Sequence, residues 1–272
     1  MNILLFYITV IAYLLATLIS IAYLISHNEK VIRVANHTIL TGFIFHTLTI
    51  GSRWFEASRA PFANLHEVLS LFSWMVVAIY LLIRLRYRLA VLCAFVAPFA
   101  LLLLITASFL PKEIIPLAPS LMSYWLTIHV GLAFLGNAFF AMTFLFGIMY
   151  LIQEHYLKSK KVGGLYFLLP SLDILDDLSY KCLTFGFPLL TMAIFTGAIW
   201  AEYVWGSYWS WEPRQTWSLI TWFLYAALLH GRLTIGWRGR KAAMYAIISF
   251  LILISSFVII KLFSWGAHAV FK

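Results

Sequence analysis

A run of tryptophans and two flanking histidines are the residues with the most distinctive chemistry in this sequence. Residues 205–230 read "WGSYWSWEPRQTWSLITWFLYAALLH" and hold five tryptophans. Neutral imidazole is a standard axial ligand of haem iron, and two imidazoles can hold the iron from both faces. His129 lies about five residues inside one apolar stretch, roughly 7 Å deep at the helical rise, and His268 follows the last stretch. This placement predicts a haem site between the two histidines, lined by Trp205, Trp209, Trp211 and Trp217.

The polar residues inside this run indicate where a helix begins. Glu212 precedes Pro213, and a residue before proline favours extended backbone, whereas proline is well suited to the first helical position. Glu212 is therefore expected as a cap-like acid near the positive end of a helix dipole. Trp205 and Trp209 would share a face if they lie on one helix. An ordinary aromatic belt at the membrane interface is the alternative interpretation of the indoles.

Three further histidines are candidates for a second site. His230 ends the apolar stretch that contains Trp217, on the opposite side from the tryptophan run, while His46 and His37 lie together in an earlier stretch. Ionisable side chains inside membrane spans are functional candidates by default. A membrane b-type cytochrome, with histidines paired at two depths, is therefore a further alternative. The sequence contains no CxxCH motif, which argues against a c-type cytochrome.

The elements that must position these residues are membrane helices. Of the 272 residues, 63% are hydrophobic and 11% are charged, and the mean hydropathy is +0.93. These values predict an all-α, polytopic integral membrane protein that forms one transmembrane domain over 1–272. Scanning for runs of about 20 apolar residues gives eight spans: 3–25, 34–51, 67–84, 89–108, 124–152, 182–204, 214–231 and 241–263.

The basic residues predict the orientation of these spans. Of the 19 lysines and arginines, 13 lie in 27–33, 84–88, 154–181 and 231–241. Because basic loops face the cytoplasm, both termini and the outer segment 205–217 are expected outside. The cytoplasmic loop 154–181 carries "DILDDL", which is expected to form an amphipathic helix on the membrane surface. The net charge of +9 comes from these short clusters and predicts no nucleic-acid partner.

Several stretches resemble one known family. "WGSYWSWEPRQTWSLITWFLYAALLHGR" is similar to the tryptophan-rich WWD signature of the CcsA/ResC family of system II cytochrome c biogenesis proteins. "RAPFANLHEVLSLFSWMVVAIYLL" resembles that family's proline–asparagine–glutamate stretch, and "HVGLAFLGNAFF" and "SWGAHAV" resemble its histidine-bearing segments. The resemblance covers most of the chain from about residue 40 onward.

The resemblance implies haem transport and attachment. Members work with a ResB/CcsB-type membrane subunit and deliver haem b to the CxxCH motifs of apocytochrome c, in the bacterial cytoplasmic (inner) membrane or its organellar equivalent. By motif position, His129 and His268 correspond to the family's two outer haem-iron ligands. His230 corresponds to its membrane haem ligand, whose partner histidine lies in the other subunit. His46 or His37 would take that partner's place if this chain held the haem alone.

Three positions depart from the family pattern and leave more than one function open. Glu212 replaces an aspartate, Arg214 a lysine and Gln215 a glutamate. With the aromatic frame kept, the resemblance implies a subunit of a holocytochrome c synthase. A HemX-like regulator of haem synthesis, which shares the architecture, is the alternative from a regulatory class. A transporter whose indoles form only an interfacial belt would bind no haem.

Overall fold

The computed structural model describes residues 1–87, 89–114, 122–160 and 163–263, and every regular element in these ranges is a helix. This confirms the all-α prediction. The chain divides into two compact units: unit 1 contains residues 1–122 and 155–170, and unit 2 contains residues 123–154 and 171–272. The expectation of a single transmembrane domain over 1–272 stays a prediction.

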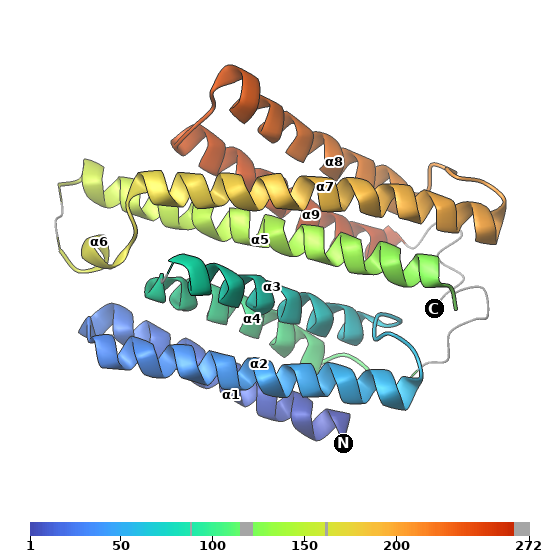
Figure 1. The fold of residues 1–272 in the computed structure, drawn as a ribbon, viewed down its shortest axis with the longest axis horizontal. Helices are drawn as coiled ribbons and strands as arrows, with labels where there is room; N and C mark the ends of the chain where they lie inside the picture. Colours follow the sequence, from blue (N-terminus) through green and yellow to red (C-terminus); the bar gives the residue numbers. More distant parts are fainter. Residues whose placement is uncertain (88, 115–121, 161–162, 264–272) are drawn as a thin grey trace. The chain divides into compact units, whose positions relative to one another are not determined.

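Unit 1 is built from a helical hairpin and a second helix pair (Figure 1). Its helices are α1 Asn2–Ser26, α2 Glu29–Ala57, α3 Leu65–Tyr87, η1 Ala90–Leu92, α4 Cys93–Ser108 and the short α6 Leu165–Leu168. His27, in left-handed backbone at φ 55°, ends α1. The side chain of Asn28 then accepts a hydrogen bond from Lys30 N at 2.9 Å and starts α2. This pairing of an αL C-cap with an asparagine N-cap produces a two-residue turn between the helices.

Unit 2 carries the tryptophan run. Its helices are α5 Tyr124–Lys158, whose last four residues belong to unit 1, α7 Leu172–Trp205, α8 Pro213–His230, the π-helical turn η3 Gly231–Ile235, and α9 Arg240–Phe263. Two glycines bring α5 and α7 close together: a Cβ on Gly136 would lie 3.1 Å from Gly186 O, and a Cβ on Gly186 would lie 2.8 Å from the ring of Phe140. Small residues allow such close approach of membrane helices. The indole of Trp222 on α8 donates to Thr191 Oγ1 of α7 at 2.9 Å and joins the third helix to this pair.

Seven of the helices are long and apolar enough to cross a membrane, within the described residues, and they coincide with seven of the eight predicted spans. The chain is therefore an integral membrane protein. Residues 34–51, the eighth predicted span, are helical within α2, whose 29 residues are long enough to cross a bilayer but not apolar enough to be counted with the seven. The asparagine, histidines and threonines of residues 34–51 lower the hydropathy of this stretch. Such polar groups are stable in a membrane helix when they bond to the backbone or to other helices, as Thr49 Oγ1 does to Phe45 O at 2.9 Å.

The stretch "DILDDL" is helical, as predicted, but it forms the start of a longer helix, and its place on the membrane surface stays a prediction. Asp173 and the residues after it form the first turns of α7, which continues without a break to Trp205. Ser171 caps this helix by accepting from Ile174 N at 3.4 Å. The strong start signal at Ser171, together with the apolar residues that follow, joins the acidic stretch to the span.

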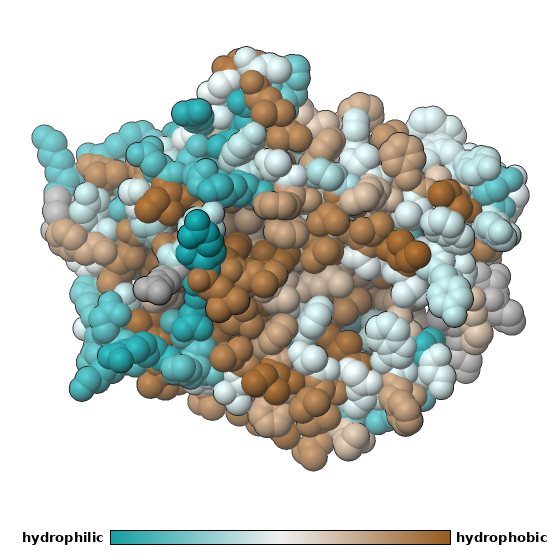
Figure 2. All heavy atoms as spheres, viewed as in Figure 1, coloured by the Kyte–Doolittle hydropathy of each residue, from teal (hydrophilic) through white to brown (hydrophobic). Residues whose placement is uncertain are grey.

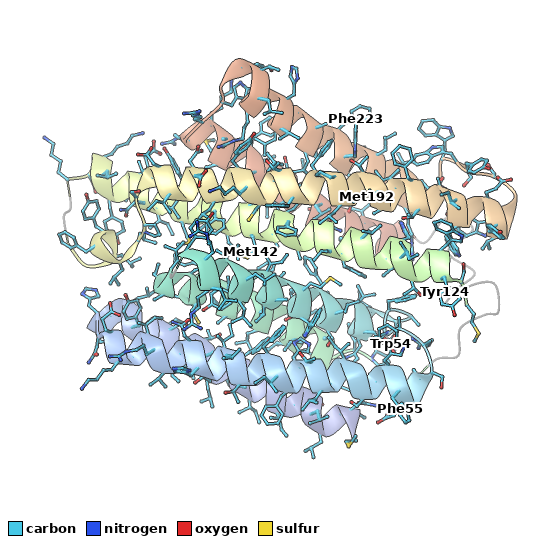
Figure 3. The ribbon with its side chains drawn as sticks, viewed as in Figure 1. Trp54, Phe55, Tyr124, Met142, Met192 and Phe223 are labelled. Carbon is cyan, nitrogen blue, oxygen red and sulfur yellow. The ribbon has the colours of Figure 1, made fainter. Side chains whose placement is uncertain are left out.

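The surface has the distribution expected of membrane helices. Hydrophobic side chains cover the middle of the face shown in Figure 2, and hydrophilic ones gather at its left-hand end. Phe223 of α8 and Met192 of α7 are exposed apolar side chains in mid-helix (Figure 3). Aromatic residues mark helix ends: Trp54 and Phe55 near the end of α2 and Tyr124 at the start of α5 are all exposed. This distribution is typical of lipid-facing helices with interfacial aromatics.

Candidate functional site

The imidazole of His129 is held by α7. His129 lies on the second turn of α5, half-buried, and its Nδ1 lies 2.7 Å from the backbone oxygen of Ala193. The ring occupies space above Gly197, one helical turn further along α7, where an added Cβ would lie 2.6 Å from Nδ1. Only glycine at position 197 therefore admits the ring in this position.

This contact determines which nitrogen carries the proton. A carbonyl oxygen can only accept, so His129 Nδ1 must donate its hydrogen to Ala193 O. In the neutral imidazole, the lone pair then resides on Nε2. A histidine that ligates a metal through one nitrogen commonly donates the other N–H to a backbone carbonyl, which fixes its tautomer and orientation. The Nδ1 contact of His129 with Ala193 O has this form.

Aromatic side chains continue from this histidine along α7. Trp200 follows Gly197 by three residues, so both lie on one face of the helix, and Trp200 is only 4% exposed. Its indole meets that of Trp205 edge to face, with ring centroids 4.9 Å apart. The sequence prediction began the aromatic surface at Trp205. The structure extends it one turn deeper, toward His129.

The loop between α7 and α8 folds over by specific backbone and side-chain bonds. α7 ends at Trp205, because Gly206 takes left-handed backbone at φ 69° and donates to Glu202 O at 2.9 Å. Gln215 of α8 reaches back and accepts from Ser210 N at 2.9 Å. Oxygen acceptors are common to glutamine and glutamate. The departure from the family pattern at Gln215 therefore keeps the atom that closes the loop while removing a charge.

The two tryptophans of this loop have unusual environments. Trp211 has φ 56° and is 69% exposed. Left-handed backbone is unfavourable for a bulky residue, and such strain concentrates at ligand sites. Trp209 packs edge to face on Trp211 with centroids 5.7 Å apart. The indole N–H of Trp209 is buried and has no hydrogen-bond partner among the residues that the structure describes.

The predicted start of α8 is confirmed. Glu212 has extended backbone, Pro213 is the first helical residue, and Thr216 N donates to Glu212 O at 2.8 Å. Glu212 is 8% exposed, whereas Trp217 is half-buried in the second turn. The shared helical face considered for Trp205 and Trp209 does not form, because the helix ends at Trp205.

The remaining histidines lie apart from this segment. His268 is outside the described residues. His230 ends α8 and is exposed; seventeen residues separate it from Pro213, which corresponds to about 26 Å along the helix. The structure therefore places His129 and His230 near opposite ends of unit 2, and the described residues contain no cluster of three or more metal-ligating side chains.

His46 connects helices of unit 1. It is completely buried, with Nδ1 3.2 Å from Tyr13 Oη and Nε2 3.0 Å from Ser70 Oγ. Both nitrogens therefore take part in hydrogen bonds that join α2 to α1 and α3. In this arrangement neither nitrogen can ligate iron, and His46 stabilises the packing of three helices.

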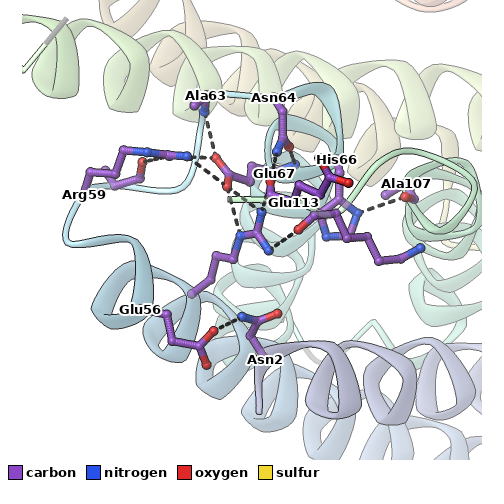
Figure 4. Close-up of polar contacts among 12 residues, drawn as sticks. Asn2, Glu56, Arg59, Ala63, Asn64, His66, Glu67, Ala107 and Glu113 are labelled. Atoms are coloured by element: carbon purple, nitrogen blue, oxygen red, sulfur yellow. Dashed lines mark hydrogen bonds and ion pairs between the residues drawn. The ribbon is translucent and has the colours of Figure 1, made fainter. Parts of the chain in front are cut away.

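The asparagine–glutamate motif forms a buried ion cluster in unit 1 (Figure 4). Glu67 accepts from Arg53 Nε and from Arg59 Nη1, both at 2.9 Å, and from Ala63 N at 2.8 Å. Asn64 accepts from Glu67 N at 2.9 Å and starts α3. Arg53 also donates to the backbone oxygens of residues 112 and 113. The cluster joins α2, α3 and the segment after α4.

Two site residues were missed by the sequence prediction. Gly197 and Trp200 matter only because α7 packs its 193–200 face against His129, and the pairing of α5 with α7 is not evident from one sequence. A signal was available in the "FTGAIWA" stretch. A glycine three residues before a tryptophan on an apolar helix places a gap beside a large side chain.

Comparisons with known proteins identify relatives of the chain. Residues 62–268 match the cytochrome C assembly protein family. The cytochrome c biogenesis protein CcsA of Guillardia theta is 34% identical over 242 residues, covering 82% of this chain and 80% of the relative. The protein of the same name from Chlamydomonas reinhardtii is 38% identical over 226 residues, covering 80% of this chain and 62% of the relative. A Synechococcus sp. CcsA is 34% identical over 242 residues, covering 80% of each.

A solved structure shares the fold. The cytochrome c haem lyase CcmF superposes with a TM-score of 0.67 at 16% sequence identity. The alignment covers 92% of this chain and 45% of that protein.

Proposed function

The chain belongs to the cytochrome C assembly protein family, and on that premise we propose that it is the haem-handling subunit of cytochrome c biogenesis. Its haem site lies at the predicted outer end of unit 2. The observation that carries the proposal is the pair of contacts that fix His129. The Ala193 carbonyl sets its tautomer, and Gly197 leaves room for its ring.

The residues present fit haem b as the substrate of this site. A planar macrocycle needs an axial ligand, flat apolar neighbours and donors for its propionates. His129 Nε2 would supply the iron ligand, with His268 as the second proposed ligand. Aromatic rings pack well on flat apolar surfaces. The flat apolar neighbours would therefore be the indoles of Trp205, Trp209, Trp211 and Trp217. The Trp209 N–H, buried without an acceptor among the described residues, suits a propionate oxygen.

Each residue has a separate task in this mechanism. Haem, when bound, supplies the iron and the vinyl groups that react with the two cysteine thiols of a CxxCH motif. Ala193 and Gly197 orient His129. The strained Trp211 presents its indole at the exposed edge, where an apocytochrome can approach. Positioning of this kind is the main contribution a protein makes when the cofactor carries the chemistry.

His230, the proposed ligand of a separate inner haem site, lies at the other end of α8. It receives haem at the cytoplasmic side in this proposal, with a second ligand from a ResB/CcsB-type membrane subunit. The membrane is the bacterial cytoplasmic membrane or its organellar equivalent. Delivery then runs from His230 to the site at His129, and from there to apocytochrome c.

The first test is the absorption spectrum of the detergent-purified chain, oxidised and reduced. We expect a low-spin haem spectrum from the unchanged chain. The His129→Ala/His268→Ala variant should lose its outer-site component. His155→Ala, which removes an exposed histidine at the far end of the same helix α5, is the matched control and should keep it. Haem that persists unchanged in the double variant would contradict the outer site.

A second measurement separates attachment from regulation. The chain is co-expressed with a ResB/CcsB-type subunit and an apocytochrome that carries CxxCH, and covalent haem is detected on the apocytochrome after denaturation. The proposal expects covalent haem that depends on His129. Haem bound to the chain without any covalent product would favour the HemX-like alternative.

A further inference from the structure

A polar clasp at the end of unit 2 opposite the tryptophans holds the turn that follows His230. After α8 the chain makes the π-helical turn Gly231–Ile235 and then enters α9 (Figure 1). Isolated π-helical turns inside or next to α-helices are uncommon and frequently occur at functional sites. Thr234 Oγ1 donates to His230 O at 2.7 Å, and Trp237 N donates to Gly231 O at 2.9 Å. These bonds close the turn on itself.

Asp176 of α7 anchors this turn. Its carboxylate accepts from Arg232 Nη1 at 2.9 Å and from Nη2 at 2.7 Å, a two-point arrangement. Gly239 N donates to Asp176 Oδ1 at 3.0 Å. The Arg232 side chain is 7% exposed and the Asp176 side chain 17%. Two-point arginine–carboxylate pairs add geometric specificity as well as energy, so one side chain of α7 fixes both ends of the connection from α8 to α9.

The aromatic neighbours restrict the arginine further. The Arg232 guanidinium lies over the ring of Tyr180, 4.9 Å from its centroid, and Tyr180 is one turn after Asp176 on α7. Arginine favours this combination of stacking and two-point pairing, which lysine cannot reproduce. Arg232 is therefore committed to α7 and is not available as a solvated surface charge.

His230 lies two residues before this anchored arginine and is itself exposed. If Arg232 were released, the last turn of α8 could fray, because helix ends lack the full set of backbone hydrogen bonds. We infer that Asp176 and Arg232 are positioning residues that hold the His230 imidazole at the exposed end of α8 for haem. The inference rests on the proposed function, since it needs haem to bind at His230.

The test uses two backgrounds of the full chain, each co-purified in detergent with the ResB/CcsB-type subunit that supplies the second ligand of the inner site. One carries His129→Ala and His268→Ala, so that only the inner site remains; the other carries His230→Ala, so that only the outer site remains. Each is titrated with haemin, and both the dissociation constant and the ferric spin state are recorded. Asp176→Asn keeps the size of the side chain but removes the charge that binds Arg232.

We expect Asp176→Asn to weaken haem binding in the inner-site background by about 10- to 100-fold, the range found when residues behind a metal ligand are changed. Binding in the outer-site background should not change. Arg240→Gln is the matched control, because it removes the Arg240–Glu154 pair of 3.3 Å, in which the arginine side chain is 59% exposed, at the same end of unit 2. Asp176→Glu, which keeps the carboxylate, should recover part of the lost affinity and the low-spin signature.

Three results would overturn the inference. Unchanged binding in both backgrounds means that the clasp does not position His230. An equal loss in both means that Asp176 supports the fold in general. An inner-site background that binds no haem even with Asp176 intact removes His230 from the proposed route, and the inference fails with it. The outer-site background still reports independently on the proposed function in that case.

Discussion

At the scale of single residues, the proposed outer site depends on the absence of a side chain at Gly197. The ring of His129 lies where a Cβ on residue 197 would be, 2.6 Å from Nδ1. A contact this short cannot be accommodated without moving the ring or the helix. The position of the His129 ring therefore requires glycine at position 197.

We expect Gly197→Ala to displace the imidazole and lower outer-site haem affinity by about 10- to 100-fold. The helix itself should not suffer, since alanine is about 1 kcal/mol more favourable than glycine in a helix interior. Haemin titration and far-ultraviolet circular dichroism measure the two effects. Gly131→Ala on α5, where a Cβ would meet nothing within 4 Å, is the control. Unaltered haem binding by Gly197→Ala would contradict the role assigned to this packing.

A second prediction concerns the strained backbone of Trp211. Left-handed backbone costs a non-glycine residue roughly 1–2 kcal/mol, and Trp211 has φ 56°. Trp211→Gly should therefore leave stability equal or slightly raised, while haem binding falls because the exposed indole is lost. Gly206→Ala is the reverse experiment at φ 69°, where a side chain would introduce strain without removing an indole. Thermal unfolding measures the effect on stability, and haemin titration measures the effect on haem affinity. A large loss of stability in Trp211→Gly would show that the indole serves the fold.

At this scale, much of the site was predictable from the sequence. The extended Glu212 and the helix start at Pro213 follow from local backbone rules, which do not depend on tertiary packing. The tautomer of His129 was not predictable, because the acceptor Ala193 lies 64 residues away on another helix. Any apolar residue at position 193 would offer the same carbonyl. The residue types therefore give no signal for this contact.

At the scale of elements, the helix starts follow local signals and the helix partners do not. Asn64 and Glu67 stand at the spacing of an N-terminal capping motif, and α3 begins between them. The arginines that complete the cluster come from α2 and the connection before α3. That these arginines meet Glu67 could not be predicted without the packing of α2 against α3. The amphipathic pattern of "DILDDL" is local, whereas the continuation of this stretch into α7 depends on contacts such as that of Asp176 with Arg232.

The buried cluster gives an element-scale prediction. Glu67→Gln leaves Arg53 and Arg59 without their carboxylate in a site where the Glu67 side chain is 1% exposed. Breaking a buried pair by removing one partner typically costs about 3–5 kcal/mol. The thermal unfolding temperature in detergent should fall clearly.

Asp177→Asn serves as the control for this prediction. It removes an exposed pair with Lys181 whose side chains are 50% and 46% exposed. Exposed pairs four residues apart on a helix contribute about 0.3–0.5 kcal/mol, so the unfolding temperature should hardly move. Equal shifts in the two variants would mean that the Glu67 cluster is not the joint between α2 and α3.

At the scale of the whole molecule, the orientation in the membrane is the property on which the proposed haem route depends. The rule that basic loops face the cytoplasm assigns the 205–217 segment to the outer side. The two native cysteines, Cys93 and Cys182, are both buried. Engineered cysteines can therefore be labelled with little reaction from the native ones.

We expect Tyr208→Cys to react with a membrane-impermeant maleimide in intact cells. Tyr208 is 60% exposed in the loop between α7 and α8. Lys160→Cys, in the connection after α5, should react only after the membrane is permeabilised. The opposite pattern would invert the protein in the membrane and place the proposed outer site in the cytoplasm.

The close approach of Gly136 and Gly186 also fixes the register of α5 against α7. Seven residues of α5 separate Gly136 from His129, and eleven residues of α7 separate Gly186 from Gly197. One inserted residue in either stretch would turn everything beyond it by about 100° and shift it by about 1.5 Å. His129 would then no longer face Ala193. The lengths of these two helical stretches are therefore under tighter constraint than their composition, so that apolar residues there can be exchanged but none can be added or removed.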